Sequence, residues 1–171
     1  SLLMRAFDIL ISIPSVLLAL AIAAGFSSGI VQLICAIAVG QLAGFTRVVR
    51  SAVLNLVDQE YIEAERALGL RDARIILGHI IPNAMDTILV QATMQVARNI
   101  LMGALLSFLG LGAPIPTPEW GQIASDGISS LRYTGHLVIF PTIFITITAL
   151  AINLFGDGLR DALDPRLKGK A

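Results

Sequence analysis

The chain has 171 residues, of which 56% are hydrophobic and 14% charged, and its mean hydropathy is +0.81. A soluble domain would carry about a quarter charged residues, so this composition excludes an ordinary soluble domain and indicates a polytopic membrane protein. The formal net charge is zero, which argues against nucleic-acid binding, and the single cysteine excludes an intrachain disulfide. Because the chain starts at Ser1 and enters an apolar segment almost at once, we expect that its natural N-terminus is missing.

Two apolar spans are predicted at the start of the chain. The first, near 6–25, is long enough as a helix to cross a hydrocarbon core of about 30 Å. Pro14 within it predicts a kink, and Arg5 and Asp8 are expected to pair because they lie three residues apart. The second span, near 30–46, is rich in alanine and glycine, whose small side chains favour close helix packing.

A polar loop near 47–83 follows, and it predicts two short helices joined by a turn. Asp58 is expected to cap the first helix, and an apolar face is formed by Tyr61, Ala64 and Leu68. A short amphipathic helix held between membrane spans is suited to docking in a groove on a cytoplasmic partner and passing on that partner's motion. The alternative is a surface helix that lies on the lipid headgroups.

Three further residues set the limits of these two helices. Gly69 is predicted to adopt the left-handed conformation that stops the first helix, and Asp72 to cap the second. Pro82 is expected to end the second helix, because a proline disfavours the helical conformation of the residue before it.

The third span, near 84–106, is the most polar of the predicted spans. Five of its side chains recur at three- or four-residue steps and suggest the lining of a translocation path: Gln91, Gln95, Arg98, Asn99 and Met102. A charged side chain inside a span should face the interior of a bundle or water, so a hydrogen-bond network with a partner subunit is the alternative. Arginine does not lose its charge in proteins, which excludes Arg98 as a proton relay.

An outer loop near 107–133 contains three prolines and cannot form one continuous helix. Its apolar residues Ile123, Ile128 and Leu131 predict a short helix lying on the membrane surface. Trp120 suits an interfacial anchor, and the alternative is that this loop contacts a binding protein or closes an outer gate.

The fourth span, near 135–156, contains Pro141 as a second kink site and leads into a polar tail, 157–171. Ten basic residues fall on one side of this four-span arrangement: Arg5, Arg47, Arg50, Arg66, Arg71, Arg74, Arg160, Arg166, Lys168 and Lys170. Only Arg132 falls on the other side. Because basic loops stay in the cytoplasm, the loop 47–83 and the tail are predicted to be cytoplasmic and 107–133 to face outward.

The cytoplasmic loop resembles the EAA loop of permease subunits from binding-protein-dependent ABC importers at Glu63, Ala64, Gly69 and Pro82. The proline stands thirteen residues after the glycine, as in that pattern, whereas Glu65 and Ile81 replace its second alanine and its leucine. Further motifs resemble the second permease subunit of dipeptide, oligopeptide and nickel importers: MRAFDILISIP at 4–14, LSFLGLG at 106–112, PTPEWG at 116–121 and NLFGDGLRDALDPRL at 153–167.

The resemblance implies an all-α integral membrane protein with the type I ABC importer permease fold, comprising about four spans of a probable six within one domain, 1–171. It also implies that the docking site for an ATPase consists of Tyr61, Glu63, Ala64, Leu68, Gly69 and Pro82. The expected partners are a second permease subunit, two ABC ATPases, an extracytoplasmic solute-binding protein and the bacterial or archaeal plasma (inner) membrane. The chain has no GxxxxGK[ST] loop, so ATP and Mg are expected on the ATPases and no cofactor on this chain. The expected solute is a short peptide, with nickel or another small solute as the alternative.

Two other classes of protein are less compatible with the sequence. A secondary transporter driven by an ion gradient needs an intramembrane carboxylate, yet Asp8 and Asp86 lie near the ends of the predicted spans. An intramembrane enzyme needs a nucleophile with a base, or a metal site, within the spans, and the sequence suggests neither. We therefore expect a transport subunit that is not itself an enzyme.

Overall fold

The computed structural model describes residues 2–26 and 29–163, and every regular element in that part of the chain is a helix. In chain order the elements are α1 Leu2–Ile11, α2 Ser15–Gly25, α3 Ile30–Val57, α4 Glu60–Ala67, α5 Asp72–Ile75, the π-helix η1 Ile76–Ile80, α6 Ile81–Phe108, α7 Trp120–Ile128 and α8 His136–Leu163. Within the described residues, three helical segments are long and apolar enough to cross a membrane, or four if the bent pair α1–α2 forms one span. The predicted all-α membrane fold is confirmed.

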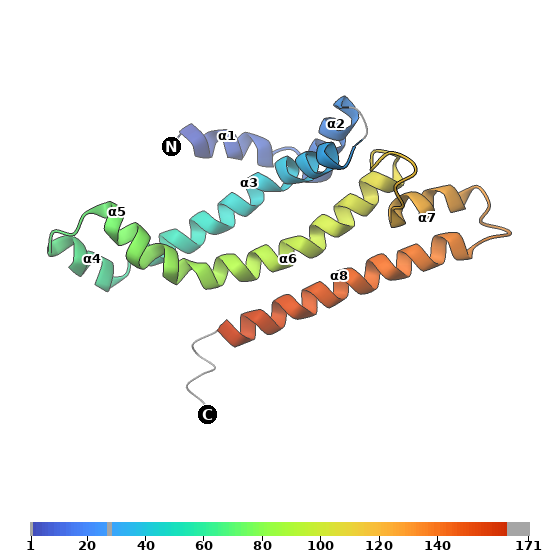
Figure 1. The fold of residues 1–171 in the computed structure, drawn as a ribbon. Coiled ribbons are helices and arrows are strands. Elements are labelled where there is room, and N and C mark those ends of the chain that lie inside the picture. Colours follow the sequence, from blue (N-terminus) through green and yellow to red (C-terminus); the bar gives the residue numbers. More distant parts are fainter. Residues whose placement is uncertain (1, 27–28, 164–171) are drawn as a thin grey trace.

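Three long helices form the body of the molecule (Figure 1). The helix α6 packs against α3 and also against α8, and α2 lies against α3. At one end, α7 packs on α6 and α8, whereas α4, α5 and η1, which we call the elbow, form the opposite end. The helix α8 ends toward the elbow, so the described part of the predicted tail, residues 157–163, lies toward the same end of the bundle as the elbow.

The first apolar segment is not one kinked helix. It forms α1 and α2, which are bent by 94° across a short break at Pro14. Asp8 contacts Arg47 of α3, with 2.8 Å between Oδ1 and Nη2, so the predicted pairing of Asp8 with Arg5 is wrong. The long arginine side chain on α3 reaches Asp8 because α1 turns back toward that helix.

The helix that contains the second predicted span continues into the polar loop. The helix α3 is unbroken from Ile30 to Val57, and Asp58 is its C-terminal capping residue. The predicted cap of α4 by Asp58 is therefore wrong, because Gln59 occupies the position before α4. Asp72 likewise does not cap α5 but is its first residue, following Arg71.

Pro82 does not end a helix, contrary to the prediction from its sequence position. Ile81 is helical, with φ −61° and ψ −49°, and the proline lies in the first turn of α6. A proline is tolerated there because the amides of a first turn have no partner within the helix. The π-helix η1 precedes it, and the Ile81 amide donates to the Ile76 carbonyl. Residues 72–108 consequently form a nearly continuous helical segment.

The outer loop contains a short helix, as predicted, but its packing face is different. In α7 the buried residues are Gly121, Ala124 and Gly127, whereas Ile128 is exposed. A Cβ atom added to Gly121 would lie 2.2 Å from the Ala104 carbonyl oxygen of α6. Small residues thus allow the backbone of α7 to approach α6 closely, as is usual between helices in membranes.

The fourth apolar segment is the 28-residue helix α8, with Pro141 buried inside it. The helix continues past the predicted end of the span, so the first residues of the predicted polar tail, including Arg160, are part of α8. The basic tail residues Arg166, Lys168 and Lys170 lie outside the described residues.

Candidate functional site

The elbow is held on the bundle by a small apolar cluster. Ile62 of α4, Ile75 of α5 and Ile80 of η1 are buried. The partly buried residues that pack against this cluster come from the end of α3 and from the turn after α4: Val53, Leu56, Val57 and Leu70. Burial of each isoleucine stabilises the elbow by about 1.5–3 kcal/mol. The cluster thus joins the short helix α4 to the ends of two long helices.

Gly69 ends α4 in the left-handed conformation, with φ +83°, as predicted. The Gly69 amide donates to the Arg66 carbonyl and the Leu70 amide donates to the Glu65 carbonyl, at 3.0 and 3.2 Å. This pair of hydrogen bonds is the Schellman motif, which satisfies the last carbonyl groups of a helix. The turn brings Leu70 back to the apolar cluster and so fixes the direction in which α4 leaves it.

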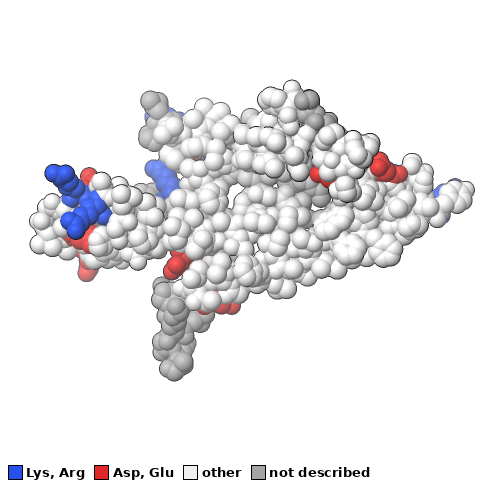
Figure 2. All heavy atoms as spheres, in the orientation of Figure 1, with Lys and Arg blue, Asp and Glu red and all other residues white. Residues whose placement is uncertain are grey.

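The opposite face of α4 is exposed. Ala64 and Glu63 are exposed, Leu68 is 80% exposed, and Tyr61 at the margin is 40% exposed. Figure 2 shows a cluster of Lys and Arg side chains over the elbow, and further basic side chains are visible elsewhere, including at the opposite end of the molecule. The predicted apolar face of Tyr61, Ala64 and Leu68 is therefore presented outward beside basic residues.

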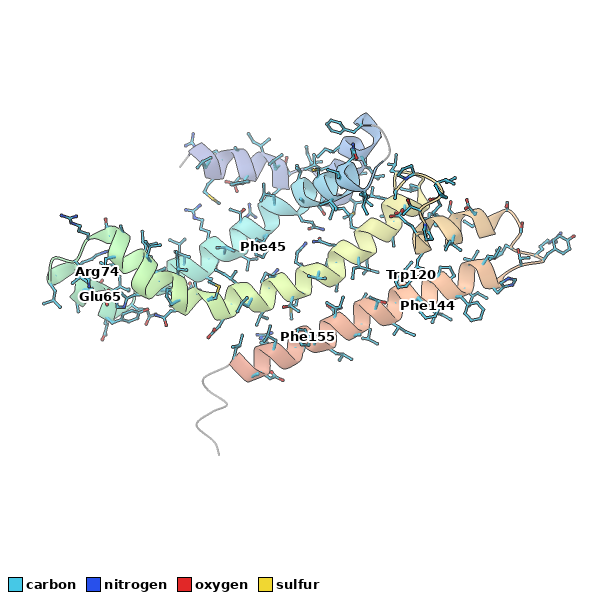
Figure 3. All side chains as sticks on the ribbon, in the orientation of Figure 1. Phe45, Glu65, Arg74, Trp120, Phe144 and Phe155 are labelled. Carbon is cyan, nitrogen blue, oxygen red and sulfur yellow. The ribbon has the colours of Figure 1, made fainter. Side chains whose placement is uncertain are left out.

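Two polar contacts of the elbow were not predicted from the sequence. His79 Nδ1 of η1 lies 3.1 Å from Glu65 Oε1 of α4, and Glu65 faces the interior of the elbow (Figure 3). Asn83 Nδ2 lies 3.5 Å from Tyr61 Oη and donates to the His79 carbonyl at 2.7 Å. Pro82 directly precedes Asn83 in the first turn of α6, and its side chain is exposed.

The five candidate path residues of α6 do not share one environment. Gln95 Nε2 donates to Asn99 Oδ1 at 3.2 Å, and Arg98 is exposed without an ion pair to any described residue. Met102 is instead buried in the apolar core between α2, α3 and α6. The helix therefore presents Gln91, Gln95, Arg98 and Asn99 at partly or fully exposed positions, and the structure does not bring Met102 to that surface.

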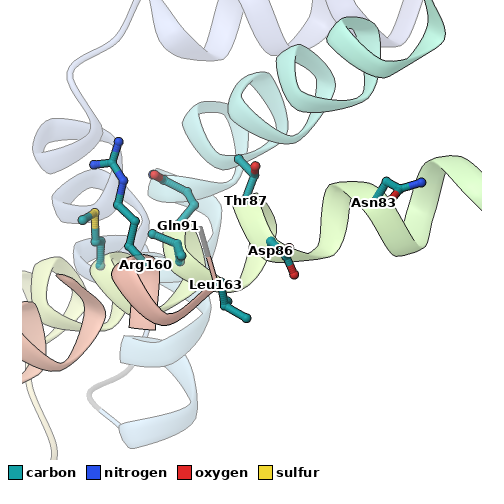
Figure 4. Close-up of a pocket in the computed structure, with 8 residues that line it drawn as sticks. Asn83, Asp86, Thr87, Gln91, Arg160 and Leu163 are labelled. Carbon is teal, nitrogen blue, oxygen red and sulfur yellow. The ribbon is translucent and has the colours of Figure 1, made fainter. Parts of the chain in front are cut away.

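A pocket of about 490 Å³ lies between α6 and the end of α8 (Figure 4). It is lined by Asn83, Asp86, Thr87, Val90, Gln91, Met94, Arg160 and Leu163. The pocket combines a carboxylate, a guanidinium and amide side chains, so both hydrogen-bond donors and acceptors face it. Gln91 is the candidate path residue that contributes to it.

The outer end is organised around Trp120 and Glu119. The Trp120 ring stacks on Phe144 of α8, with the ring centroids 5.9 Å apart (Figure 3). Glu119 Oε2 accepts a hydrogen bond from the Ala113 amide at 3.0 Å and so closes the loop that precedes α7. Trp120 is 43% exposed.

Comparison with known proteins supports the family resemblance found in the sequence. Residues 1–169 match the family described as "Binding-protein-dependent transport system inner membrane component". This match covers nearly the whole chain, and the chain belongs to that family. It is a multi-pass membrane permease component of the ABC importer class, as the sequence motifs predicted.

Several individual relatives share one protein name, which is more specific than the family description. The chain is 45% identical over 168 residues to the protein named "Glutathione transport system permease protein GsiD" from Shigella flexneri, and equally to proteins of that name from Shigella sonnei and Escherichia coli. These alignments cover 98% of this chain and 55% of each relative. The chain thus spans about half the length of the curated relatives that it matches.

Proposed function

We propose that this chain is the part of a permease subunit that couples solute passage to a separate ATPase, and that α4 is the coupling helix. The observation that carries the proposal is the outward face of α4, on which Tyr61, Ala64 and Leu68 are exposed while Ile62 anchors the helix from behind. A helix so attached is accessible to a cytoplasmic partner and also connected to α3 and α6.

The same proposal implies which partners this chain has. A second permease completes the path, two ABC ATPases bind ATP and Mg on the cytoplasmic side of a bacterial or archaeal inner membrane, and a binding protein delivers the solute outside. This chain itself then binds no cofactor and hydrolyses nothing. The matched family is named for binding-protein-dependent transport, which supports this assembly.

The test is a bulky substitution on the outward face of α4. Ala64→Trp adds a large side chain at an exposed position, so it leaves the fold intact but overfills a close contact with the ATPase. We expect membrane insertion to be normal and co-purification of the ATPase to fall at least about tenfold, since each 1.4 kcal/mol of lost binding is a tenfold loss of affinity. Uptake into vesicles supplied with ATP should fall in parallel.

The matched control is Ala73→Trp, the same change at an exposed alanine of α5, outside the α4 face. This control is expected to retain both ATPase association and uptake. Normal complex recovery and uptake with Ala64→Trp would show that α4 is not the docking helix.

We further propose that the solute is a short peptide. The relatives are named for glutathione transport, and the motifs resemble dipeptide and oligopeptide importers. A peptide carries charges of both signs, and the pocket between α6 and α8 presents Asp86 and Arg160. Nickel or another small solute is the second candidate. It is supported only by the resemblance of the sequence motifs to importers of dipeptides, oligopeptides and nickel.

The solute is tested by ATP-dependent uptake into vesicles that hold the complete transporter. We expect labelled glutathione or a dipeptide to accumulate and nickel ions not to. If the exposed polar residues of α6 line the path, Arg98→Ala should lower this uptake or change its selectivity while the ATPase stays bound. If the partner permease is lost from the Arg98→Ala complex, Arg98 belongs to a structural network instead. Uptake of nickel without peptide uptake would replace the peptide assignment.

A further inference from the structure

The contact between Glu65 and His79 joins the proposed coupling helix to the base of a span. His79 Nδ1 lies 3.1 Å from Glu65 Oε1, and the Glu65 side chain is only 18% exposed. Glu65 belongs to α4, whereas His79 belongs to η1, which continues directly into α6. The contact therefore links two elements that are separated by the turn at Gly69.

The Glu65 carboxylate occupies a costly position. Its second oxygen, Oε2, is buried and has no hydrogen-bond partner among the described residues. An unsatisfied buried acceptor destabilises a fold, and an alanine at this position, as in the EAA pattern, would carry no such cost. A group that costs stability at this position is more simply explained by a role in the movement of α4 than by a role in folding.

The apolar cluster alone does not fix α4 against α6. Contacts of Ile62 with Ile75 and Ile80 hold α4 on the bundle, but they are non-directional. A polar pair requires a defined distance and direction. Asn83 adds a second polar contact, since its amide lies 3.5 Å from Tyr61 Oη and donates to the His79 carbonyl. The two polar contacts hold α4 at two points, both against the helical segment that becomes α6.

We propose that Glu65 and His79 are a positioning pair that fixes α4 to the base of α6, so that displacement of α4 by the ATPase moves this span. The inference rests on the proposed function of α4. Glu65 is largely turned away from the outward face of α4, and His79, whose side chain is 42% exposed, lies on η1 and not on α4. They act after docking, by passing the movement on.

The experiment compares Glu65→Ala, His79→Ala and the double variant in the complete transporter. The quantity measured is uptake per ATP hydrolysed, together with ATPase association and the thermal midpoint of the complex. We expect each single variant to keep the ATPase bound and to lower uptake per ATP by at least about twofold, the lower limit of the coupling between contacting residues. The double variant should be no worse than the poorer single variant, because the contact is lost only once.

Two further variants complete the design. The exchange of Glu65→His with His79→Glu restores the pair in reverse and should recover uptake per ATP. Glu60→Ala removes an exposed glutamate from the same helix and should leave this ratio unchanged. For Glu65→Ala the thermal midpoint should stay constant or rise, since the buried unpaired oxygen is removed, and a role confined to folding would lower it instead.

The proposal is overturned if the single variants couple normally, if the double variant shows the product of the two single losses, or if the single variants lose the ATPase. Each of these results is distinct from failure of the proposed function. If the wild-type chain does not associate with an ATPase, the assignment of α4 fails, whatever the Glu65 and His79 variants show.

Discussion

At the residue scale, the backbone conformation of Gly69 restricts which residues can replace it. Its φ of +83° is rarely adopted by residues with a side chain, yet nothing lies within 4 Å of a Cβ atom added there. Gly69→Val therefore meets no steric clash and costs only backbone strain, about 1–3 kcal/mol. We expect α4 to change its direction and the ATPase to dissociate or hydrolyse ATP without uptake, as measured by co-purification and vesicle uptake.

Gly78 provides the control for this prediction. It lies in η1, also has nothing within 4 Å of an added Cβ atom, and its φ is not positive. Gly78→Val should therefore retain ATPase association and uptake. Gly69→Asn should fall between the two valine variants, because asparagine tolerates the left-handed conformation better than valine does. Normal coupling in Gly69→Val would contradict the role assigned to the turn.

The sequence predicted Gly69 but not Ile62, and the reason is physical. A glycine that follows an amphipathic helix usually adopts the left-handed conformation that ends the helix, so the residue type alone is enough to predict this turn. Ile62 lies between Tyr61 and Glu63 and falls outside the face read from the sequence, because burial in the elbow depends on residues of α3 and η1 that are distant along the chain. The Glu65–His79 contact depends on the same folding of the elbow and could not be predicted from residue spacing.

At the scale of elements, two prolines with similar sequence signals behave differently. Pro14 separates α1 from α2 by a bend of 94°, whereas Pro82 lies in the first turn of an almost continuous helical segment. The difference arises from η1, whose hydrogen bonds are shifted by one residue ahead of Pro82. Sequence rules for proline therefore located both irregularities but predicted the wrong form for each.

The close approach of α7 to α6 gives a prediction about packing. Gly121→Ala would place a methyl group 2.2 Å from the Ala104 carbonyl oxygen, so α7 must move away from α6. Overpacking of this kind costs about 1–3 kcal/mol, and we expect a lower thermal midpoint in detergent. In the control, Gly158→Ala, the added methyl group in α8 meets nothing within 4 Å, so the midpoint should be unchanged or slightly higher. Equal midpoints for the two variants would contradict the packing.

At the scale of the whole molecule, three of the four spans predicted from hydropathy lie in long helices, and the first is a bent pair of short helices. The three long helices contain the predicted segments 30–46, 84–106 and 135–156. Their ends were not predicted, because α3 and α8 continue as helices beyond the apolar residues that the bilayer selects. Hydropathy measures where a helix leaves the membrane, whereas the helix itself ends only where capping and packing stop it.

The basic residues also predict the orientation of the chain in the membrane. Two single-cysteine variants, one on each side, test this orientation. Cys35 is exposed and is first replaced by serine, so that it does not react. Leu68→Cys in the elbow and Ile115→Cys in the outer loop are then matched, because these positions are 80% and 79% exposed. Since ten of the twelve basic residues fall on one side of the four-span arrangement predicted from the sequence, and that side includes the elbow, the elbow should be cytoplasmic. In intact cells a membrane-impermeant maleimide should label position 115 and not position 68, and both should react after the cells are permeabilised. Labelling of position 68 from outside would reverse the orientation and remove α4 from contact with any cytoplasmic ATPase.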